Sequence, residues 1–169
     1  QEIVQEFSEE MLPMAVPMAE QLVRAFEGYA AAAGDGGDEL DEAQYSAAQT
    51  LETLNCLIEA AQGSQEILER IEPVVLPVMQ RVLTEEEEHF DYIDNVVEML
   101  SFLTYFVEDV RPNIWSLAGP LISSLGGWAY DYISEIQMPV LTYLSKDPTT
   151  FMQTSYKVVA LSLVWLFSP

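Results

Sequence analysis

The sequence is poor in the residues that most often build catalytic and metal sites. Its 169 residues include one cysteine and one histidine, so an internal disulfide and a zinc site built from cysteines are both excluded. The lone cysteine, Cys56, precedes Leu57 and Ile58, an apolar setting that predicts a buried and unreactive thiol. The shortage of cysteine also indicates a reducing compartment.

Basic residues are scarce as well. Six Lys and Arg residues stand against 28 Asp and Glu residues, and the formal net charge is −22. Such a chain repels nucleic acid and anionic membranes, whereas its field attracts basic partners. A second interpretation stays open, in which the acidity only keeps an apolar helical protein in solution.

No long hydrophobic run is present. The longest apolar stretch lies near Val158–Phe167, about half of the ~20 residues that a spanning helix needs, so we expect a buried helix and no membrane insertion. The start, Gln1-Glu2, lacks the basic and apolar parts of a signal peptide. The missing initiator Met and the abrupt end at Ser168-Pro169 suggest a piece of a longer chain.

Helical periodicity is what the sequence does have, most clearly between residues 85 and 126. Thr84 and Glu87 have the spacing of a capping box, and they predict a helix that starts there with four glutamates in its first turn. Pro112 predicts the first position of a second helix, and Gly126-Gly127 its end. The first of these helices has apolar residues at every third or fourth position: Ile93, Val96, Val97, Leu100, Leu103, Val107 and Val110.

Similar start and stop signals divide the whole chain into helical hairpins. They cover approximately residues 1–31 (partial), 41–83, 85–126 and 129–168, and an acidic loop spans residues 33–41. In the last hairpin, Asp147 is the predicted N-cap and Pro148 the first helical residue. The third helix of the chain should bury Tyr45, Ala48, Leu51, Leu54, Ile58 and Ala61.

Proline pairs recur along the chain. Pro13 and Pro17 match Pro73 and Pro77 in spacing, and Pro112 follows Pro73 by 39 residues, close to the ~40–47 residues of a HEAT-type repeat. The sequence therefore predicts an all-α fold, a right-handed HEAT-repeat-like superhelix of about four hairpins. The second helices should lie together on one side of the stack: Pro13–Tyr29, Gln65–Leu83, Pro112–Leu125 and Pro148–Phe167.

Catalytic chemistry finds little support. Glu86-Glu87-Glu88-His89 contains the Glu-x-x-His pattern of di-iron bundles, but such a site needs two of these motifs and this is the only histidine. No glycine-rich phosphate loop and no Ser/His/Asp set is recognisable. We therefore expect no metal, no cofactor, no catalytic residue and no enzymatic activity.

Two acidic clusters are the candidate binding sites for Lys/Arg-rich protein segments. Their alternative role is capping and solubility. The aromatic residues Tyr92, Phe102, Tyr105, Phe106, Trp115, Trp128, Tyr130 and Tyr132 should pack in the core and between repeats. The candidate residues for binding such segments are Asp35, Asp38, Glu39, Asp41 and Glu42 in the first cluster and Glu85, Glu86, Glu88, Asp91 and Asp94 in the second.

The chain resembles the importin-β (karyopherin-β) superfamily, and within it the importin-seven/eight type, in the C-terminal half of the receptor. The resemblance covers most of residues 30–145. It rests on the acidic insertion Gly34–Glu42 leading into Ala48–Ile58, on Glu88–Thr104, on Arg111–Leu121, on Gly127–Tyr132 and on Met138–Leu141.

This resemblance implies a nuclear import receptor that shuttles between cytoplasm and nucleus. Such receptors carry basic cargo, including ribosomal proteins and histones, bind Phe-Gly nucleoporins and release cargo to Ran-GTP. The Ran-binding repeats of the family are N-terminal, so a Ran contact would lie outside this chain. The alternative is an acidic helical scaffold, adaptor or chaperone of basic proteins without a transport role, which has no reason to bind Phe-Gly peptides.

Overall fold

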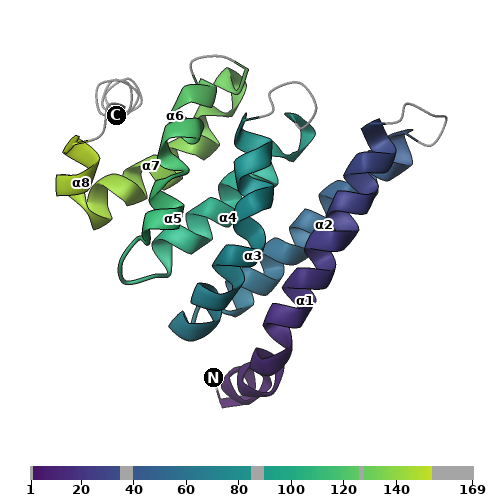
Figure 1. The fold of residues 1–169 in the computed structure, drawn as a ribbon. Coiled ribbons are helices and arrows are strands. Elements are labelled where there is room, and N and C mark those ends of the chain that lie inside the picture. The colour runs from purple at the N-terminus through teal and green to yellow at the C-terminus, as the bar shows by residue number, and fades with distance from the viewer. Residues whose placement is uncertain (1, 35–39, 85–89, 126–127, 154–169) are drawn as a thin grey trace. The chain divides into compact units, whose positions relative to one another are not determined.

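The structure is a computed structural model that describes residues 2–34, 40–84, 90–125 and 128–153 (Figure 1). Within these residues every regular element is an α-helix or a short 3₁₀-helix, and no strand occurs. The predicted all-α, HEAT-like fold class is confirmed. The chain divides into two compact units, residues 1–78 (unit 1) and 79–169 (unit 2).

Unit 1 is built on a pair of long helices. α1 (Glu2–Gly34) and α2 (Leu40–Ala60) lie side by side and in contact (Figure 1), and they carry buried apolar residues such as Ala19, Phe26 and Leu54. α3 (Gln65–Thr84) begins in unit 1, where Ile67, Leu68, Ile71, Val75 and Val78 are buried. Their three- and four-residue spacing makes one apolar face of the helix.

The prediction that a second helix starts near Pro13 is wrong, because α1 continues through Pro13 and Pro17. Both prolines are exposed, whereas Ala15 and Ala19 are buried. A proline removes one backbone N–H and leaves a carbonyl one turn earlier without its helical partner. On the outer face of a helix water can satisfy that carbonyl, so the helix tolerates the pair.

Two predicted core positions of α2 are also wrong. Tyr45 is 67% exposed, because the buried face near the start of α2 falls on Ala47 instead. Cys56 was expected to be buried, but its thiol is exposed. It shares the outer face of the helix with Glu52 and Glu59, which lie four residues before and three residues after it.

Unit 2 contains two segments in which a short 3₁₀-helix leads directly into an α-helix, and we call each a 3₁₀–α element. η1 (Phe90–Tyr92) leads into α4 (Ile93–Tyr105), and η2 (Tyr130–Tyr132) leads into α7 (Ile133–Lys146). α4 and α6 (Ala118–Leu125) both pack against α7. The core of the unit includes Ile93, Val96, Val97, Leu100, Leu103, Leu121, Ile136 and Val140.

The predicted capping box at Thr84 is wrong. Thr84 is the last residue of α3, and its hydroxyl donates to the carbonyl of Gln80 at 2.8 Å, back into its own helix. α4 begins only at Ile93, after Tyr92, which makes no side-chain capping hydrogen bond. Glu87 and the other glutamates of the predicted first turn lie outside the described residues.

The predicted helix at 112–125 is interrupted. α5 (Pro112–Trp115) ends after one turn, and α6 starts at Ala118. Pro120 explains the interruption, since it cannot donate to the carbonyl of Ser116 and its ring crowds that carbonyl. The Leu117 N–H instead donates to the Ile114 carbonyl at 3.0 Å, a tighter 3₁₀-type turn.

The predicted start of the last helix is confirmed. The Thr150 N–H donates to the Asp147 carboxylate at 2.9 Å, and Pro148 is the first residue of α8 (Pro148–Gln153). Hydrogen bonds from the Thr150 side chain and then its N–H lower the pKa of Asp147. The division into four hairpins, and the right-handed stacking of their second helices, stay predictions.

Candidate functional site

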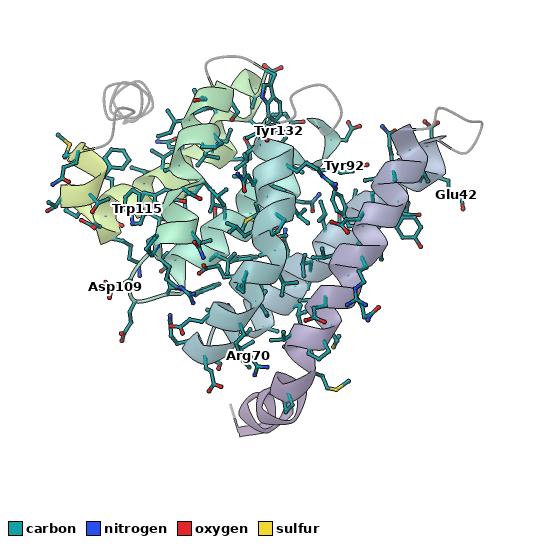
Figure 2. All side chains as sticks on the ribbon, viewed as in Figure 1. Glu42, Arg70, Tyr92, Asp109, Trp115 and Tyr132 are labelled. Atoms are coloured by element: carbon teal, nitrogen blue, oxygen red, sulfur yellow. The ribbon has the colours of Figure 1, made fainter. Side chains whose placement is uncertain are left out.

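One end of unit 2 gathers carboxylates from four elements. We call this the α4–α7 acidic cluster: Asp91 of η1, Asp94 and Glu98 of α4, Asp131 of η2, and Glu135 of α7. All five side chains are exposed. Figure 2 shows Tyr92 and Tyr132 at this end of the unit and Asp109 at the opposite end. The packing of α4 on α7 therefore brings together charges that lie about 40 residues apart in the sequence.

A short internal repeat creates this arrangement. Phe90-Asp91-Tyr92-Ile93 and Tyr130-Asp131-Tyr132-Ile133 match in three of four positions, with an offset of 40 residues. In each copy the first three residues form a 3₁₀ turn and the isoleucine opens an α-helix. Asp94 and Glu135 then fall in the first turn of their helices, where the helix dipole favours negative charge.

The pKa of Asp94 is raised, partly because these charges are crowded. Partial burial raises its pKa first, and the neighbouring carboxylates of Glu135 and then Glu98 raise it further. Opposed carboxylates disfavour each other's ionised form, which is the physical cause of the second effect. Asp94 thus lies close enough to Glu135 and Glu98 for their charges to disfavour its ionised form.

The two tyrosines of the repeat differ in their surroundings. Burial and the charge of Asp91 raise the pKa of Tyr92, and Arg81 partly offsets them. The pKa of Tyr132 is raised by burial and then by Asp94, Asp91, Asp131 and Glu135. The half-buried Tyr132 therefore lies within the field of four carboxylates of the α4–α7 acidic cluster.

The structure describes only some residues of each predicted acidic cluster. Asp91 and Asp94 of the second cluster lie together in the α4–α7 acidic cluster, whereas Glu85, Glu86, Glu88 and His89 are outside the described residues. In the first cluster, Asp41 and Glu42 are exposed in the first turn of α2. The loop residues Asp35, Asp38 and Glu39 are also outside the described residues.

Sequence reasoning missed Glu98, Asp131 and Glu135. The signal that could have found the latter two is the aromatic-Asp-Tyr-Ile repeat, since equivalent positions of stacked repeats have equivalent surroundings. Glu98 is found only by following the outer face of α4 from Asp94 by one turn.

The described residues contain neither a candidate metal site nor a candidate membrane span. Among them, no group of three or more His, Cys, Asp or Glu side chains has the geometry to hold a metal ion. In the same part of the chain, no helix has both the length and the apolar character required to cross a bilayer.

Comparison with known proteins gives relatives that share one name. The chain is 30% identical over 145 residues to an importin beta-like SAD2 homolog of Arabidopsis thaliana, an alignment that covers 85% of this chain. It is 25% identical over 154 residues to a probable importin-7 homolog of Dictyostelium discoideum and 22% identical over 156 residues to importin-8 of Homo sapiens. These two alignments cover 89% and 92% of the chain.

The chain spans 14% of the length of each of these relatives. No family model matches the sequence, and no solved structure matches it. The three relatives nevertheless align over nearly the whole chain, and all three carry importin names. The resemblance predicted from the sequence is therefore confirmed, and this chain is a segment of importin-β family type.

Proposed function

We propose that this chain is the part of a nuclear import receptor that holds basic protein cargo. The observation that carries the proposal is the α4–α7 acidic cluster, in a chain whose relatives are named importins. The cargo would be Lys/Arg-rich proteins such as ribosomal proteins and histones. The receptor would shuttle between cytoplasm and nucleus, bind Phe-Gly nucleoporins, and meet Ran-GTP through repeats outside this chain.

The electrostatics support cargo capture rather than catalysis. Five exposed carboxylates at one end of unit 2 concentrate part of the net charge of −22 there and produce a local negative field. Such a field accelerates the encounter with a basic partner and selects against acidic ones. Because the carboxylates already repel one another, a bound cation relieves part of that repulsion.

The first acidic cluster is proposed as a second contact for cargo. Asp41 and Glu42 are exposed at the start of α2, next in sequence to Asp35, Asp38 and Glu39. Replacing the last three by Asn and Gln is expected to weaken binding of a Lys/Arg-rich peptide without lowering stability. Binding that is unchanged by these substitutions would remove the loop from the proposed contact.

The test of the α4–α7 acidic cluster is a binding titration with a fluorescein-labelled Lys/Arg-rich peptide. The variant combines Asp94→Asn, Glu98→Gln and Glu135→Gln. At ~0.5 kcal/mol for each exposed charge pair, the loss of three should weaken binding about ten-fold. Affinity of the parent chain should fall steeply above ~0.15 M salt, where the Debye length is ~8 Å.

The matched control removes three exposed carboxylates from unit 1, through Glu27→Gln, Glu59→Gln and Glu66→Gln. Equal losses in the two triple variants would mean that only net charge matters, and the cluster would lose its role. A parallel titration with a Phe-Gly peptide separates a transport receptor from an acidic scaffold or chaperone, since only the receptor is expected to bind it.

A further inference from the structure

Tyr45 and Tyr105 are the most exposed tyrosines among the described residues. Each is 67% exposed, although both were predicted to pack in the core. Tyr45 lies near the start of α2 in unit 1, and Tyr105 is the last residue of α4 in unit 2. A phenol in solvent is open to a modifying enzyme, and the surroundings of the two rings differ in ways that such an enzyme can detect.

The residues before the two rings differ in charge. Asp41 and Glu42 (Figure 2) precede Tyr45 by four and three residues and are exposed in the first turn of α2. The four residues before Tyr105, at positions 101–104, carry no charge. Protein kinases discriminate among substrates partly by charge pattern. A kinase with a basic substrate-binding surface therefore favours Tyr45 over Tyr105.

The start of α2 is also held by little buried surface. Among residues 41–47, only Ala47 is buried, at 0% exposed. A helix end that carries few buried contacts opens at low free-energy cost. The segment around Tyr45 can therefore leave the helix and enter a kinase active site as an extended chain, while the buried residues from Ala47 onward stay in place.

The end of α4 does not allow the same opening. Leu103 and Thr104, the two residues before Tyr105, are 1% and 0% exposed. The Thr104 hydroxyl also donates to the Leu100 carbonyl at 2.9 Å. The Tyr105 ring lies edge-on to Phe106, with 5.5 Å between ring centroids. Extending the chain at Tyr105 would expose two buried side chains, which the opening at Tyr45 does not.

The other described tyrosines lack one of these features. Tyr92 follows an aspartate but is 2% exposed, and Tyr143 is 1% exposed. Tyr132 is half-buried. Tyr29 is 44% exposed, but Glu27 is the only carboxylate among the four residues before it. Tyr45 alone among them combines high exposure, two preceding carboxylates and an element end without buried side chains.

We propose that Tyr45 is a phosphorylation site for a tyrosine kinase that selects acidic residues before its target. The γ-phosphoryl group of ATP is transferred to the phenol oxygen of Tyr45. The new bond joins this oxygen to the γ-phosphorus, the bond from that phosphorus to the β,γ-bridging oxygen breaks, and ADP leaves. The phenol proton goes to the catalytic base of the kinase. This regulation lies beyond the proposed function and does not depend on it.

Phosphorylation of Tyr45 loosens the start of α2. The phosphate adds a charge of about −1.5 to −2 at neutral pH, three and four residues after Glu42 and Asp41. Like charges at this spacing destabilise a helix. Amide hydrogen exchange of residues 41–46 should therefore accelerate about two- to five-fold. The amides of Leu51 and Leu54, whose side chains are buried, should exchange at an unchanged rate.

The test treats the 169-residue chain with ATP and a purified tyrosine kinase that prefers acidic residues before the tyrosine. Mass spectrometry follows the phosphate at each tyrosine over time. Tyr45 should be modified about five-fold faster than Tyr105 or more, the effect of two exposed charge pairs on recognition. Tyr105 is the matched control within the same molecule because its exposure is the same.

Two variants assign the signal and its cause. Tyr45→Phe should remove the fast phase of phosphate incorporation. The double variant Asp41→Asn, Glu42→Gln should slow modification of Tyr45 about five-fold and leave Tyr105 unchanged. These carboxylates favour the helix start through its dipole, so any loosening of α2 in the double variant would speed the reaction. A slower reaction therefore reports recognition of charge.

The outcomes separate recognition from opening. Equal rates at Tyr45 and Tyr105, or an unaltered rate in the double variant, would show that exposure alone governs the reaction, and the proposal would be wrong. A synthetic peptide of residues 41–49 tests the opening. If the peptide is phosphorylated but Tyr45 of the folded chain is not, α2 does not open and the proposal is also wrong. If neither is phosphorylated, the sequence is no substrate and the proposal fails.

Discussion

The buried hydroxyl of Tyr143 allows a sharp test of how unit 2 is held together. It donates to the Ile114 carbonyl at 2.5 Å across 29 residues of sequence, and each of the two residues is 1% exposed. The ring also packs on Trp115, with 4.7 Å between centroids. Tyr143→Phe removes only the hydroxyl, because phenylalanine keeps the ring and its contacts.

The size of the effect depends on the hydrogen bond that the Ile114 carbonyl retains in Tyr143→Phe. Losing a buried partner costs about 1–3 kcal/mol when the remaining group has no other hydrogen bond. The Ile114 carbonyl still accepts from the Leu117 N–H at 3.0 Å, so we expect about 1–1.5 kcal/mol of lost stability. For a chain of this size that corresponds to a fall in Tm of roughly 2–6 °C.

Urea denaturation measures the change, with an unaltered m value if only stability has changed. Tyr105→Phe is the control, because it removes a hydroxyl from an exposed ring and should change stability by less than ~0.5 kcal/mol. Equal urea midpoints for the two variants would show that the buried hydrogen bond does not contribute the expected stability.

The pH dependence gives an independent reading of the same group. Burial raises the pKa of Tyr143 above its ordinary value near 10. In the unfolded chain the phenol ionises at its ordinary pKa, so above about pH 10 unfolding releases a proton. The contribution is therefore complete below that pH and is lost as pH rises. Stability of the parent should fall more steeply above pH 10 than that of Tyr143→Phe, and parallel curves would contradict this.

Three further predictions use other residues. Asp147→Ala should remove the cap of α8 and lower Tm at neutral pH. Because the pKa of Asp147 is lowered in the folded chain, the higher Tm of the parent should persist above the unfolded pKa of about 3.9. The difference in Tm should vanish as pH falls below that value. Glu135→Gln should lower the pKa of Asp94, measured by NMR titration, since Glu135 is a cause of its rise; an unmoved pKa would contradict this. Pro73→Ala, within α3, should raise stability in urea denaturation by roughly 1–2 kcal/mol by restoring a helical N–H, whereas Pro112→Ala at a first helical position should give no such gain.

The fold was predictable where one helical face alone decides burial. The apolar spacing in α4 located Val96, Val97 and Leu100 in the core, and all three are buried. Asp147 was predictable because capping is local, with its carboxylate and the N–H of Thr150 three residues apart.

The failures arose where a local signal has two meanings. A threonine followed three residues later by a glutamate fits a helix start, but the Thr84 hydroxyl can equally bond back to the preceding turn, as it does. Pro13 and Pro17 can open a helix or sit on its exposed face, and only the packing of α1 on α2 decides. Tyr45 and Cys56 were predicted on the buried face of α2, but both lie on its exposed face.

The candidate site needed tertiary information. Asp91 and Asp94 were identified from a run of acidic sequence, but their neighbours come from α7, about 40 residues later. No pattern within a single helix reports that contact. The repeated aromatic-Asp-Tyr-Ile segment does, since it sets Asp91 and Asp131 at equivalent positions of two successive 3₁₀–α elements.

The repeat also explains how a helical chain concentrates charge at one end of a unit. Each 3₁₀–α element places an aspartate at its start, at Asp91 and Asp131, where the helix dipole offsets part of the cost of the charge. The packing of α4 on α7 then brings the starts of these two elements, with their aspartates, to one end of unit 2. The charges repel, and the raised pKa of Asp94 records it. That repulsion costs stability in the free chain and would be relieved by a bound cation, so under the proposed function the packing that assembles unit 2 also favours a basic ligand.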